Sequence, residues 1–396
     1  MKIGVWVDRD FNPKAGGAFS YYNRLIEKLD EYDFNDDTEL VFISQSVIED
    51  KFNKDTLCIS SIPKWIIKLV SKLPFLSSLI YRFELKYLKS FFVSNLIRND
   101  IKLIYYLKQS TCHIPDFPFI ATNWDIGHLS TYSFPEISSK KEYLRRSIYY
   151  ENILPRAMMV FCESEASKKE LLNFTNLGAH KIKIVPLFSG NVSSLSVNKD
   201  ELEKTLSKYK LINNQFFFYP AQFWAHKNHF GLINAFSLFL KKHPNYKLVL
   251  CGSDKGNLNY IKQITNDLKI QDSVLFTGFV TNEELYSFYK CSSALVMASH
   301  FGPTNIPPIE SMEIGCPVIC SDIQGHREIL ENAGIYFNSF DINSIFKSMV
   351  ILNEKRDEFH QKITQRNNNN LFNIDNSINQ ISKFLSEVVL IRNNWD

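Results

Sequence analysis

Short apolar segments rich in Val, Ile, Leu and Phe alternate along the chain with segments whose apolar residues recur at helical spacing. Such an alternation is typical of parallel sheets built from strand–helix–strand units. In the first half, the predicted strands are residues 2–8, 40–45, 102–108, 119–125, 157–164 and 181–187. In the second half, they are residues 216–222, 246–252, 273–280, 294–299 and 317–322.

A segment rich in small and polar residues, SGNVSSLSVNKDELE, separates the two series of strands and has the composition of a linker. We therefore expect an α/β protein with two Rossmann-like, doubly wound parallel-sheet domains, over residues 1–190 and 191–376. A last amphipathic helix within residues 377–396 is expected to pack back on the first domain. Because ligands bind at the carboxyl ends of such strands, the predicted site is a cleft between the domains.

Composition narrows the class of protein. The chain has 396 residues, of which 45% are hydrophobic and 22% charged, as expected for a globular protein of two or three domains. A net charge of +3 gives no basic excess of the kind that nucleic-acid binding requires. The seven cysteines form no C-x-x-C pair and several lie in apolar runs, which indicates a reducing compartment. No apolar run approaches ~18 residues, and the N-terminal one is too short for a signal peptide, so we expect a cytoplasmic protein.

Two glycines follow the first predicted strand. Gly16 and Gly17 open a predicted helix that begins near Ala18. The N–H groups at this helix start would face the cleft and bind an anion, although an ordinary helix-entry turn has the same pattern. The same stretch holds Asp8 and Asp10, a spacing that can chelate a divalent cation. The arginine between them and the downstream glycines favour a charged strand end, so we expect no metal.

Three further polar residues are predicted to be catalytic. Asp125 and His128 follow the fourth strand, at the expected cleft mouth, where His128 could hydrogen-bond a polar substrate; a lone histidine is also common on the surface or in the core. Lys227 stands at the start of a helix after the first strand of the second half. A cation there suits a pyrophosphate, although solvated lysines at helix entrances are common.

The stretch SHFGPTNIPPIESMEIGCPVICSD, from Ser299 to Asp322, combines a glycine–proline loop, a helix start and a nearby carboxylate. The prolines suit the first helical turn, where N–H groups have no intrahelical partner. The other free N–H groups can hold phosphate oxygens. Glu310, one turn further on, could accept hydrogen bonds from a ribose diol. The pattern predicts a nucleoside diphosphate as the ligand.

The same stretch resembles the G-x-P-P-x-E-A-M-x-x-G-x-P-V-I-x-S block of glycosyltransferase family 4, the group 1 transferases, which have the GT-B fold of two Rossmann-like domains. The similarity continues through GHREILENAGIYFN and AQFWAHKN, and more faintly through GGAFSYY and NWDIGHL. The resemblance implies a GDP- or UDP-sugar donor, with Glu310 on the ribose, Lys227 on the diphosphate and the glycine loop near the distal phosphate and sugar. The implied donor-binding residues are Gly16, Gly17, Gln222, Lys227, Gly302, Pro303, Thr304, Asn305, Ile306 and Glu310.

Two positions depart from the family pattern. Gly302 stands where the family has the first glutamate of E-x7-E, and no acidic residue occurs from Leu285 to Ile309. Gln222 stands where the family commonly has a diphosphate-binding arginine. The FGPTN and HKN segments resemble a bacterial subgroup that shares both changes, so we interpret them as a variant donor site.

Residues 62–92 carry six basic residues and one acidic residue. Lys64, Lys68 and Lys72 recur at a spacing of four, with Trp65 among the apolar residues of the opposite helical face. This pattern is typical of a helix lying in an anionic membrane surface, where it would also serve the acceptor. The alternative is a crossover helix packed on the first sheet with its lysines in solvent.

The sequence as a whole predicts a retaining glycosyltransferase that needs neither metal nor cofactor. We expect transfer of a mannosyl- or glucosyl-type hexose from a nucleoside diphosphate sugar to a saccharide or a polyprenyl-diphosphate-linked saccharide. The expected setting is bacterial surface polysaccharide or lipopolysaccharide synthesis, in the cytoplasm at the inner face of the cell membrane. Two alternatives stay open: a nucleotide-sugar epimerase of the same fold, which would need carboxylates around the sugar, and a non-catalytic nucleotide-sugar-binding subunit.

Overall fold

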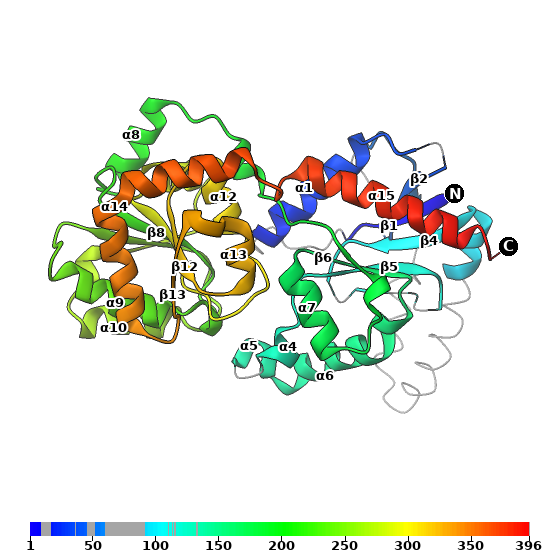
Figure 1. Cartoon of the computed structure of the whole chain (residues 1–396), viewed down its shortest axis with the longest axis horizontal. Coiled ribbons are helices and arrows are strands. Elements are labelled where there is room, and N and C mark those ends of the chain that lie inside the picture. Colours follow the sequence, from blue (N-terminus) through cyan, green and yellow to red (C-terminus); the bar gives the residue numbers. More distant parts are fainter. Residues whose placement is uncertain are drawn as a thin grey trace, which may run out of the picture.

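The computed structural model describes residues 1–8, 17–35, 37–45, 52–59, 92–109, 111–112, 114, 116–131 and 134–395. These residues form two α/β domains side by side, each built on a parallel sheet flanked by helices (Figure 1). The predicted pair of parallel-sheet domains is confirmed.

The sheet of the first domain has the strand order β3-β2-β1-β4-β5-β6-β7, and every neighbouring pair is parallel. Its strands are β1 (Lys2–Trp6), β2 (Glu39–Ser44), β3 (Thr56–Cys58), β4 (Ile101–Tyr106), β5 (Phe119–Asn123), β6 (Met159–Cys162) and β7 (Ile182–Ile184). Six of them were predicted. The edge strand β3 was not, because three half-exposed residues carry too little hydrophobic pattern to be recognised.

The sheet of the second domain has the order β10-β9-β8-β11-β12-β13, again with parallel pairs throughout. Its strands are β8 (Phe216–Pro220), β9 (Lys247–Cys251), β10 (Val274–Gly278), β11 (Ala294–Met297), β12 (Val318–Ser321) and β13 (Gly334–Phe337). The strands are almost continuously apolar because helices cover both faces of a doubly wound sheet. Phe216, Phe217 and Phe218, for example, are all fully buried.

Helices follow most strands in both domains. Those of the first domain are α1 (Gly17–Glu31), α4 (Gly127–Ser130), α5 (Pro135–Ser138), α6 (Lys140–Ile148), η2 (Tyr149–Ile153), η3 (Leu154–Arg156), α7 (Glu165–Phe174) and η4 (Ala179–Lys181). The second domain and the segments joined to it contain η5 (Asn191–Ser194), α8 (Lys199–Lys208), η6 (Ala225–Lys227), α9 (His229–Leu240), α10 (Leu258–Asp267), η7 (Gln271–Ser273), α11 (Asn282–Cys291), α12 (Ile306–Ile314), α13 (Gln324–Leu330), η8 (Glu331–Ala333) and α14 (Ile342–Asn368).

The segment between the domains is held against α1. Arg24 on α1 donates hydrogen bonds to the carbonyl oxygens of Ser189 and Gly190, at 2.8 and 3.0 Å. The backbone N–H of Asn191 donates to the hydroxyl of Ser20, at 3.2 Å. The segment whose composition predicted a linker is therefore held in one position beside the cleft.

The chain returns to the first domain at its end. Helix α14 bends at Lys355, and α15 (Ile374–Arg392) then lies alongside α1 (Figure 1). Lys183 forms an ion pair with Glu387 of α15 at 2.6 Å, and the hydroxyl of Ser377 donates to the Pro186 carbonyl at 2.6 Å. The last helix thus joins the two domains a second time.

None of the described helices is both long enough and apolar enough to cross a membrane. The residues predicted to contact a membrane surface, Lys64, Trp65, Lys68 and Lys72, lie outside the described part of the chain.

Candidate active site

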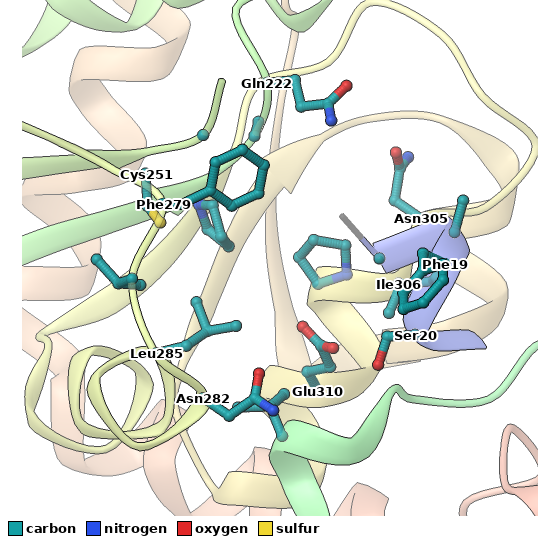
Figure 2. A pocket seen from close by; sticks show the side chains of 18 of the residues that line it. Phe19, Ser20, Gln222, Cys251, Phe279, Asn282, Leu285, Asn305, Ile306 and Glu310 are labelled. Atoms are coloured by element: carbon teal, nitrogen blue, oxygen red, sulfur yellow. The ribbon is translucent and has the colours of Figure 1, made fainter. Parts of the chain in front are cut away.

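Two adjoining cavities lie where the two domains meet. The larger cavity, of about 680 Å³, is lined by the start of α1, the linker and the ends of strands in the second domain (Figure 2). The smaller cavity, of about 270 Å³, lies toward the first domain. The residues that line both cavities are Ala18, His226, Lys227, Asn305 and Ile306. The predicted cleft at the carboxyl ends of the strands is therefore present as two connected compartments.

Two helices begin at the junction of the cavities. Helix α1 begins at Gly17 and α12 at Ile306, and a Cβ placed on Gly17 would lie 3.4 Å from the Ile306 side chain. The first turn of each helix leaves backbone N–H groups without intrahelical partners, and both helix dipoles are positive at this end. The junction is therefore suited to bind an anion.

Lys227 adds a full positive charge at the same point. Its ammonium donates to Asn305 Oδ1 at 3.0 Å, and the walls of the cavity shield it from water, so that burial lowers the pKa of Lys227 to about 8. Asp125 and Glu136, both in the first domain, act in the opposite direction and favour the charged form. Lys227 is therefore a largely protonated cation at neutral pH that faces a cavity able to hold a phosphate.

A chain of hydrogen bonds orients this lysine. His326 on α13 is fully buried, and burial lowers its pKa to about 4, so the imidazole is neutral. Its Nδ1 lies 2.8 Å from the Ser321 carbonyl and its Nε2 lies 3.0 Å from Asn305 Nδ2. With Nδ1–H donating to the carbonyl, Nε2 accepts from the Asn305 amide, and the amide oxygen then points to Lys227. The arrangement fixes the position of the cation before any ligand binds.

Glu310 lies on α12, deeper in the larger cavity, and is only 6% exposed. The Tyr289 hydroxyl donates to its Oε2 at 2.6 Å, and burial raises the pKa of Glu310 to about 7. Figure 2 shows its carboxyl group near Ser20 of α1. The linker approaches closely here, because a Cβ on Gly190 would lie 2.5 Å from Ser20 Oγ and 3.2 Å from Glu310 Oε1. Glu310 can therefore accept hydrogen bonds from hydroxyl groups in a water-poor setting.

The far end of the larger cavity is more apolar. Cys251, Phe279 and Leu285 line it, with the amide group of Gln222 near Phe279, while Asn282 lines the cavity closer to Glu310 (Figure 2). The Phe279 side chain is 52% exposed, although it borders a cavity. An exposed aromatic ring beside an amide group offers a stacking surface and hydrogen bonds to a flat heterocycle. This end suits a nucleobase.

The smaller cavity has carboxyl groups from the first domain. Asp125 follows β5 and accepts from Arg146 Nη1 at 2.7 Å and from the Gly127 N–H at 2.9 Å. Burial acts to raise the pKa of Asp125, but Arg146 and these hydrogen bonds outweigh it and hold the pKa below its usual range. Glu163 follows β6, and burial raises its pKa to about 8. Its carboxyl group accepts a hydrogen bond from the Thr304 hydroxyl of the second domain.

The predicted catalytic histidine does not line either cavity. His128 is fully buried on α4, where its ring packs 4.8 Å from that of Tyr150 and 6.1 Å from that of Tyr143. Neither ring nitrogen has a hydrogen-bond partner among the described residues, and burial lowers the pKa of His128 to about 4. The structure therefore places His128 in the core, which was one of the alternatives for a lone histidine. Helix α4 turns its side chain inward immediately after Asp125.

The other predicted residues are brought together. Gly17, Gln222, Lys227, Asn305, Ile306 and Glu310 line the larger cavity, and Asp125, Gly302, Pro303 and Thr304 line the smaller one. Gly16 lies outside the described residues. Asp8 is 3.7 Å from Lys108, and among the described residues no group of three His, Cys, Asp or Glu side chains could hold a metal ion. The expectation of a metal-free site stays a prediction.

Several residues of the site were not predicted: Ser20, Glu163, Phe279, Tyr289 and His326. Glu163 had a usable signal, because it is an acidic residue at the carboxyl end of a predicted strand, as Asp125 is. Tyr289 and His326 had none, because each acts on a cavity residue from a neighbouring helix that only the folded chain brings near.

Polar contacts also hold the two domains together outside the cavities. Glu136 on α5 accepts from the backbone N–H of His226 at 3.0 Å and contacts its ring. Glu328 on α13 accepts from the N–H groups of Glu165 and Ala166, at 3.0 and 2.8 Å, and so caps the start of α7 across the interface. These contacts define a closed arrangement of the cleft.

Comparisons with known proteins relate part of the chain to a described family. Residues 199–369, which include Lys227, Asn305 and Glu310, match the family model described as "Glycosyl transferases group 1". The O-antigen chain mannosyltransferase B of Escherichia coli is 24% identical over 238 residues, covering 59% of this chain and 61% of its own. The O-antigen chain mannosyltransferase RfbU of Salmonella typhimurium is 25% identical over 266 residues, covering 66% and 68%. The chain thus spans only about two thirds or less of the length of these relatives.

Solved structures match over nearly the whole chain. A glycosyltransferase from Rickettsia africae has a TM-score of 0.70 at 16% identity and covers 99% of this chain and 98% of its own. HepE from Anabaena, in complex with UDP-glucose, has a TM-score of 0.69 at 16% identity, with coverage of 98% and 100%. The fold is therefore GT-B, as expected, and within it residues 199–369 match the group 1 glycosyltransferase family model.

Proposed function

We propose that this protein transfers a hexose from a nucleoside diphosphate sugar to a saccharide acceptor, with retention of anomeric configuration, during the synthesis of a bacterial surface polysaccharide. One observation carries the proposal. A part-buried lysine, two helix starts and a buried glutamate meet in a single cavity between the domains, next to a second cavity that has room for a further group.

The order of these groups matches the order of groups in a nucleotide sugar. A nucleobase fits beside Phe279, the ribose diol reaches Glu310, and the diphosphate lies against Lys227 and the starts of α1 and α12. The sugar then enters the smaller cavity, which shares Lys227 with the larger one. UDP-glucose in the structurally similar HepE complex and the mannosyltransferase names of the relatives favour a UDP- or GDP-hexose, of glucosyl or mannosyl type.

The proposed chemistry needs no covalent intermediate with the protein. The bond from the sugar C1 to the diphosphate oxygen breaks as the acceptor oxygen forms a bond to C1 on the same face. The acceptor proton passes to the departing diphosphate. Lys227 and the two helix starts stabilise the negative charge that develops on the diphosphate, which is usually the largest contribution to such catalysis. In this proposal the positive charge comes from these protein groups, and no metal is required.

We propose a lipid-linked acceptor, reached at the inner face of the cell membrane by a cytoplasmic protein. The support is the sequence pattern alone: Lys64, Lys68 and Lys72 recur at a spacing of four among apolar residues that include Trp65, as in a helix that lies in an anionic membrane surface. Flotation with phosphatidylglycerol liposomes tests this part. Binding that high salt weakens is the expected result, and protein that stays at the bottom of the gradient contradicts membrane association while leaving the transfer reaction standing.

A nucleotide-sugar epimerase is the second candidate, and one observation now favours it. The loop of the second domain lacks carboxylates, but the first domain places Asp125 and Glu163 at the smaller cavity. Against it, Asp125 is held by Arg146 and the Gly127 N–H, which leaves it poorly placed to exchange protons with a sugar.

The deciding experiment begins with a thermal-shift screen of UDP- and GDP-sugars. The stabilising donor is then incubated with and without a lipid-linked saccharide extract, in buffer with EDTA. Acceptor-dependent release of the nucleoside diphosphate and a glycosylated product support the transferase, and the NMR coupling constant of the new linkage reports retention. Conversion of the donor to an epimer without acceptor supports the epimerase. Binding without turnover supports a non-catalytic subunit, and activity that requires added Mg²⁺ or Mn²⁺ contradicts the metal-free mechanism.

A further inference from the structure

The loop that forms one wall of the smaller cavity has no acidic side chain of its own. No Asp or Glu occurs from Leu285 to Ile309. Gly302, at the centre of the loop, has φ +123°, a conformation that other residues rarely adopt, and a Cβ there would lie 3.2 Å from the Thr304 carbonyl. The backbone of the second domain therefore comes too close at Gly302 to carry a side chain, and the loop offers no carboxyl group to the cavity.

Glu163 reaches this cavity from the opposite domain. It follows β6 directly and is only 6% exposed, yet its side chain lines the cavity. The hydroxyl of Thr304 donates to its Oε1 and the backbone N–H of Thr304 also donates to the carboxyl group, so this loop residue is the hydrogen-bond partner of Glu163 among the described residues. A carboxyl group has room for several hydrogen bonds, and burying one with a single partner is costly. The carboxyl group is therefore poised for a further polar partner.

The position of the smaller cavity indicates the chemical class of that partner. Lys227 and the starts of α1 and α12 lie at the junction between the two cavities. A ligand whose diphosphate binds there and whose nucleoside fills the larger cavity extends its next group into the smaller one. In a nucleotide sugar that group is the hexose, whose hydroxyls both donate and accept hydrogen bonds. A carboxyl group that is largely protonated near neutral pH can also do both, and burial raises the pKa of Glu163 to about 8.

We propose that Glu163 and Thr304 together form the site that recognises a hydroxyl group of the transferred sugar, and that they determine which sugar the protein accepts. The inference rests on the proposed function, because it assigns residues to the sugar end of that donor. Glu163 comes from the first domain and Thr304 from the second, so the recognition site is complete only when the domains are closed.

A purely structural role for Glu163 is the competing explanation. The domains already have polar contacts outside the cavities, between Glu136 and His226 and between Glu328 and the start of α7. These contacts need no carboxyl group inside the cavity. A residue pair that only holds the two domains together, here called a structural clasp, would strengthen the binding of every ligand that needs the closed arrangement. That includes a nucleoside diphosphate that has no sugar.

The test compares Glu163→Gln and Thr304→Val with the wild-type protein. Calorimetry measures the dissociation constants of UDP, GDP, UDP-glucose and GDP-mannose, and steady-state kinetics measures kcat/KM for the active donor. We expect nucleoside diphosphate affinity to stay within about twofold, while donor affinity and kcat/KM fall by about ten- to a hundredfold, as for the loss of a hydrogen bond to a buried carboxyl group. Because the two side chains act as one unit, the double variant is expected to lose little more than either single variant.

Deoxy donors identify the hydroxyl group. The wild-type protein is expected to discriminate strongly against one of the 2-, 3-, 4- or 6-deoxy analogues of the active donor, and Glu163→Gln to lose most of that discrimination. Glu170→Gln is the matched control. Glu170 is another part-buried carboxyl with a raised pKa, about 7, but it lies on α7 and lines neither cavity.

The outcomes are distinct. If Glu163→Gln and Thr304→Val weaken nucleoside diphosphates as much as donors, the pair is a structural clasp and the inference is wrong. If neither variant changes donor affinity or deoxy-sugar discrimination, Glu163 does not contact the sugar, although the transferase proposal stands. If the wild-type protein binds no UDP, GDP or sugar derivative of either, the proposed function fails and this inference with it. Should Glu163→Gln fail to fold, Thr304→Val alone carries the same comparison.

Discussion

The two domains bring opposite kinds of chemistry to the cavities they share. The second domain contributes a cation at Lys227 and the start of α12, both of which suit an anion. The first contributes the start of α1 and three carboxyl groups, Glu27, Asp125 and Glu163. The comparison indicates that the two domains have different roles. The second domain mainly holds the charged leaving group, and the first domain mainly provides the polar groups that recognise the transferred sugar.

The two contributions are also coupled electrostatically. Burial between the domains lowers the pKa of Lys227, whereas Asp125 and Glu136 raise it. The first domain therefore helps to keep the cation of the second domain charged in the absence of ligand. Opening the cleft would expose Lys227 to water and also move it away from these carboxyl groups. Closure therefore affects the pKa of Lys227 as well as the shape of the site.

Removing the cation of the second domain should have the largest effect. We predict that Lys227→Met lowers kcat/KM for the donor by about 100- to 1000-fold, the usual range for the loss of one charge-stabilising group at a reaction centre. The reason is that a charged diphosphate would then face Asp125 and Glu136 without a neutralising side chain. Kinetics with the active donor, together with calorimetry of UDP or GDP, measures the loss.

Lys255→Met is the matched control for this variant. Lys255 lies 5.5 Å from the centre of the Trp224 ring, close to the site, but it lines neither cavity. Its replacement should leave kcat/KM within about twofold, because exposed lysines contribute little. Equal losses in the two variants would show that general positive charge, rather than the position of Lys227, matters.

The second domain was the more predictable half of the site. Lys227, Asn305 and Glu310 each lie in a short segment in which a buried strand leads into a helix start, and such segments carry a local pattern of glycine, proline and polar residues. The eleven strands predicted in the two halves are present, because a continuous apolar run marks a buried strand irrespective of its neighbours. The short β13 was missed although most of its residues are buried, because four residues give too short an apolar run to mark a strand.

The first domain was less predictable because its contributions depend on contacts made in the folded chain. Nothing near Glu163 in the sequence shows that it meets Thr304, which is 141 residues away. His128 illustrates the opposite case: its position after a strand suggested the cleft, but on α4 its ring packs against that of Tyr150. The direction of a side chain at a strand end depends on the turn that follows, and the hydrophobic pattern does not encode that turn.

Glu310→Gln tests whether the deeper carboxyl group of the second domain hydrogen-bonds the nucleoside. We predict weaker donor binding by about 1–3 kcal/mol, because an amide replaces a carboxyl group as the hydrogen-bond acceptor. The nucleoside diphosphate without sugar should lose as much, in contrast to the Glu163 variants. Glu313→Gln on the same helix contacts Ser189 but lines neither cavity, so it should bind as the wild type does. Wild-type affinity in Glu310→Gln would remove Glu310 from the site.

The pH dependence of binding sharpens the electrostatic comparison. A lysine is charged below its pKa, so with a pKa of about 8 Lys227 attracts the diphosphate at neutral pH and loses its charge as the pH rises through about 8. We therefore expect the affinity for UDP or GDP to fall by up to about tenfold per pH unit above that point. In Lys227→Arg the decline should be absent, because arginine stays charged. An identical decline in both proteins would assign it to another group.

The smallest predicted effect concerns the contact that joins the domains away from the cavities. Glu328 accepts from the N–H groups of Glu165 and Ala166 at the start of α7, so Glu328→Ala removes a helix cap that exists only in the closed arrangement. Such a cap contributes about 0.5–2 kcal/mol, so the population should shift toward an open cleft without a change in the cavity residues. Small-angle scattering of the ligand-free protein should give a larger radius of gyration than for the wild type. Donor affinity should fall only a few-fold, because part of the binding energy then closes the cleft.

Glu331→Ala is the control, since Glu331 lies nearby but pairs with Arg366 within the second domain. Unchanged scattering and affinity in Glu328→Ala would mean that the contacts at the cavities alone keep the two domains together.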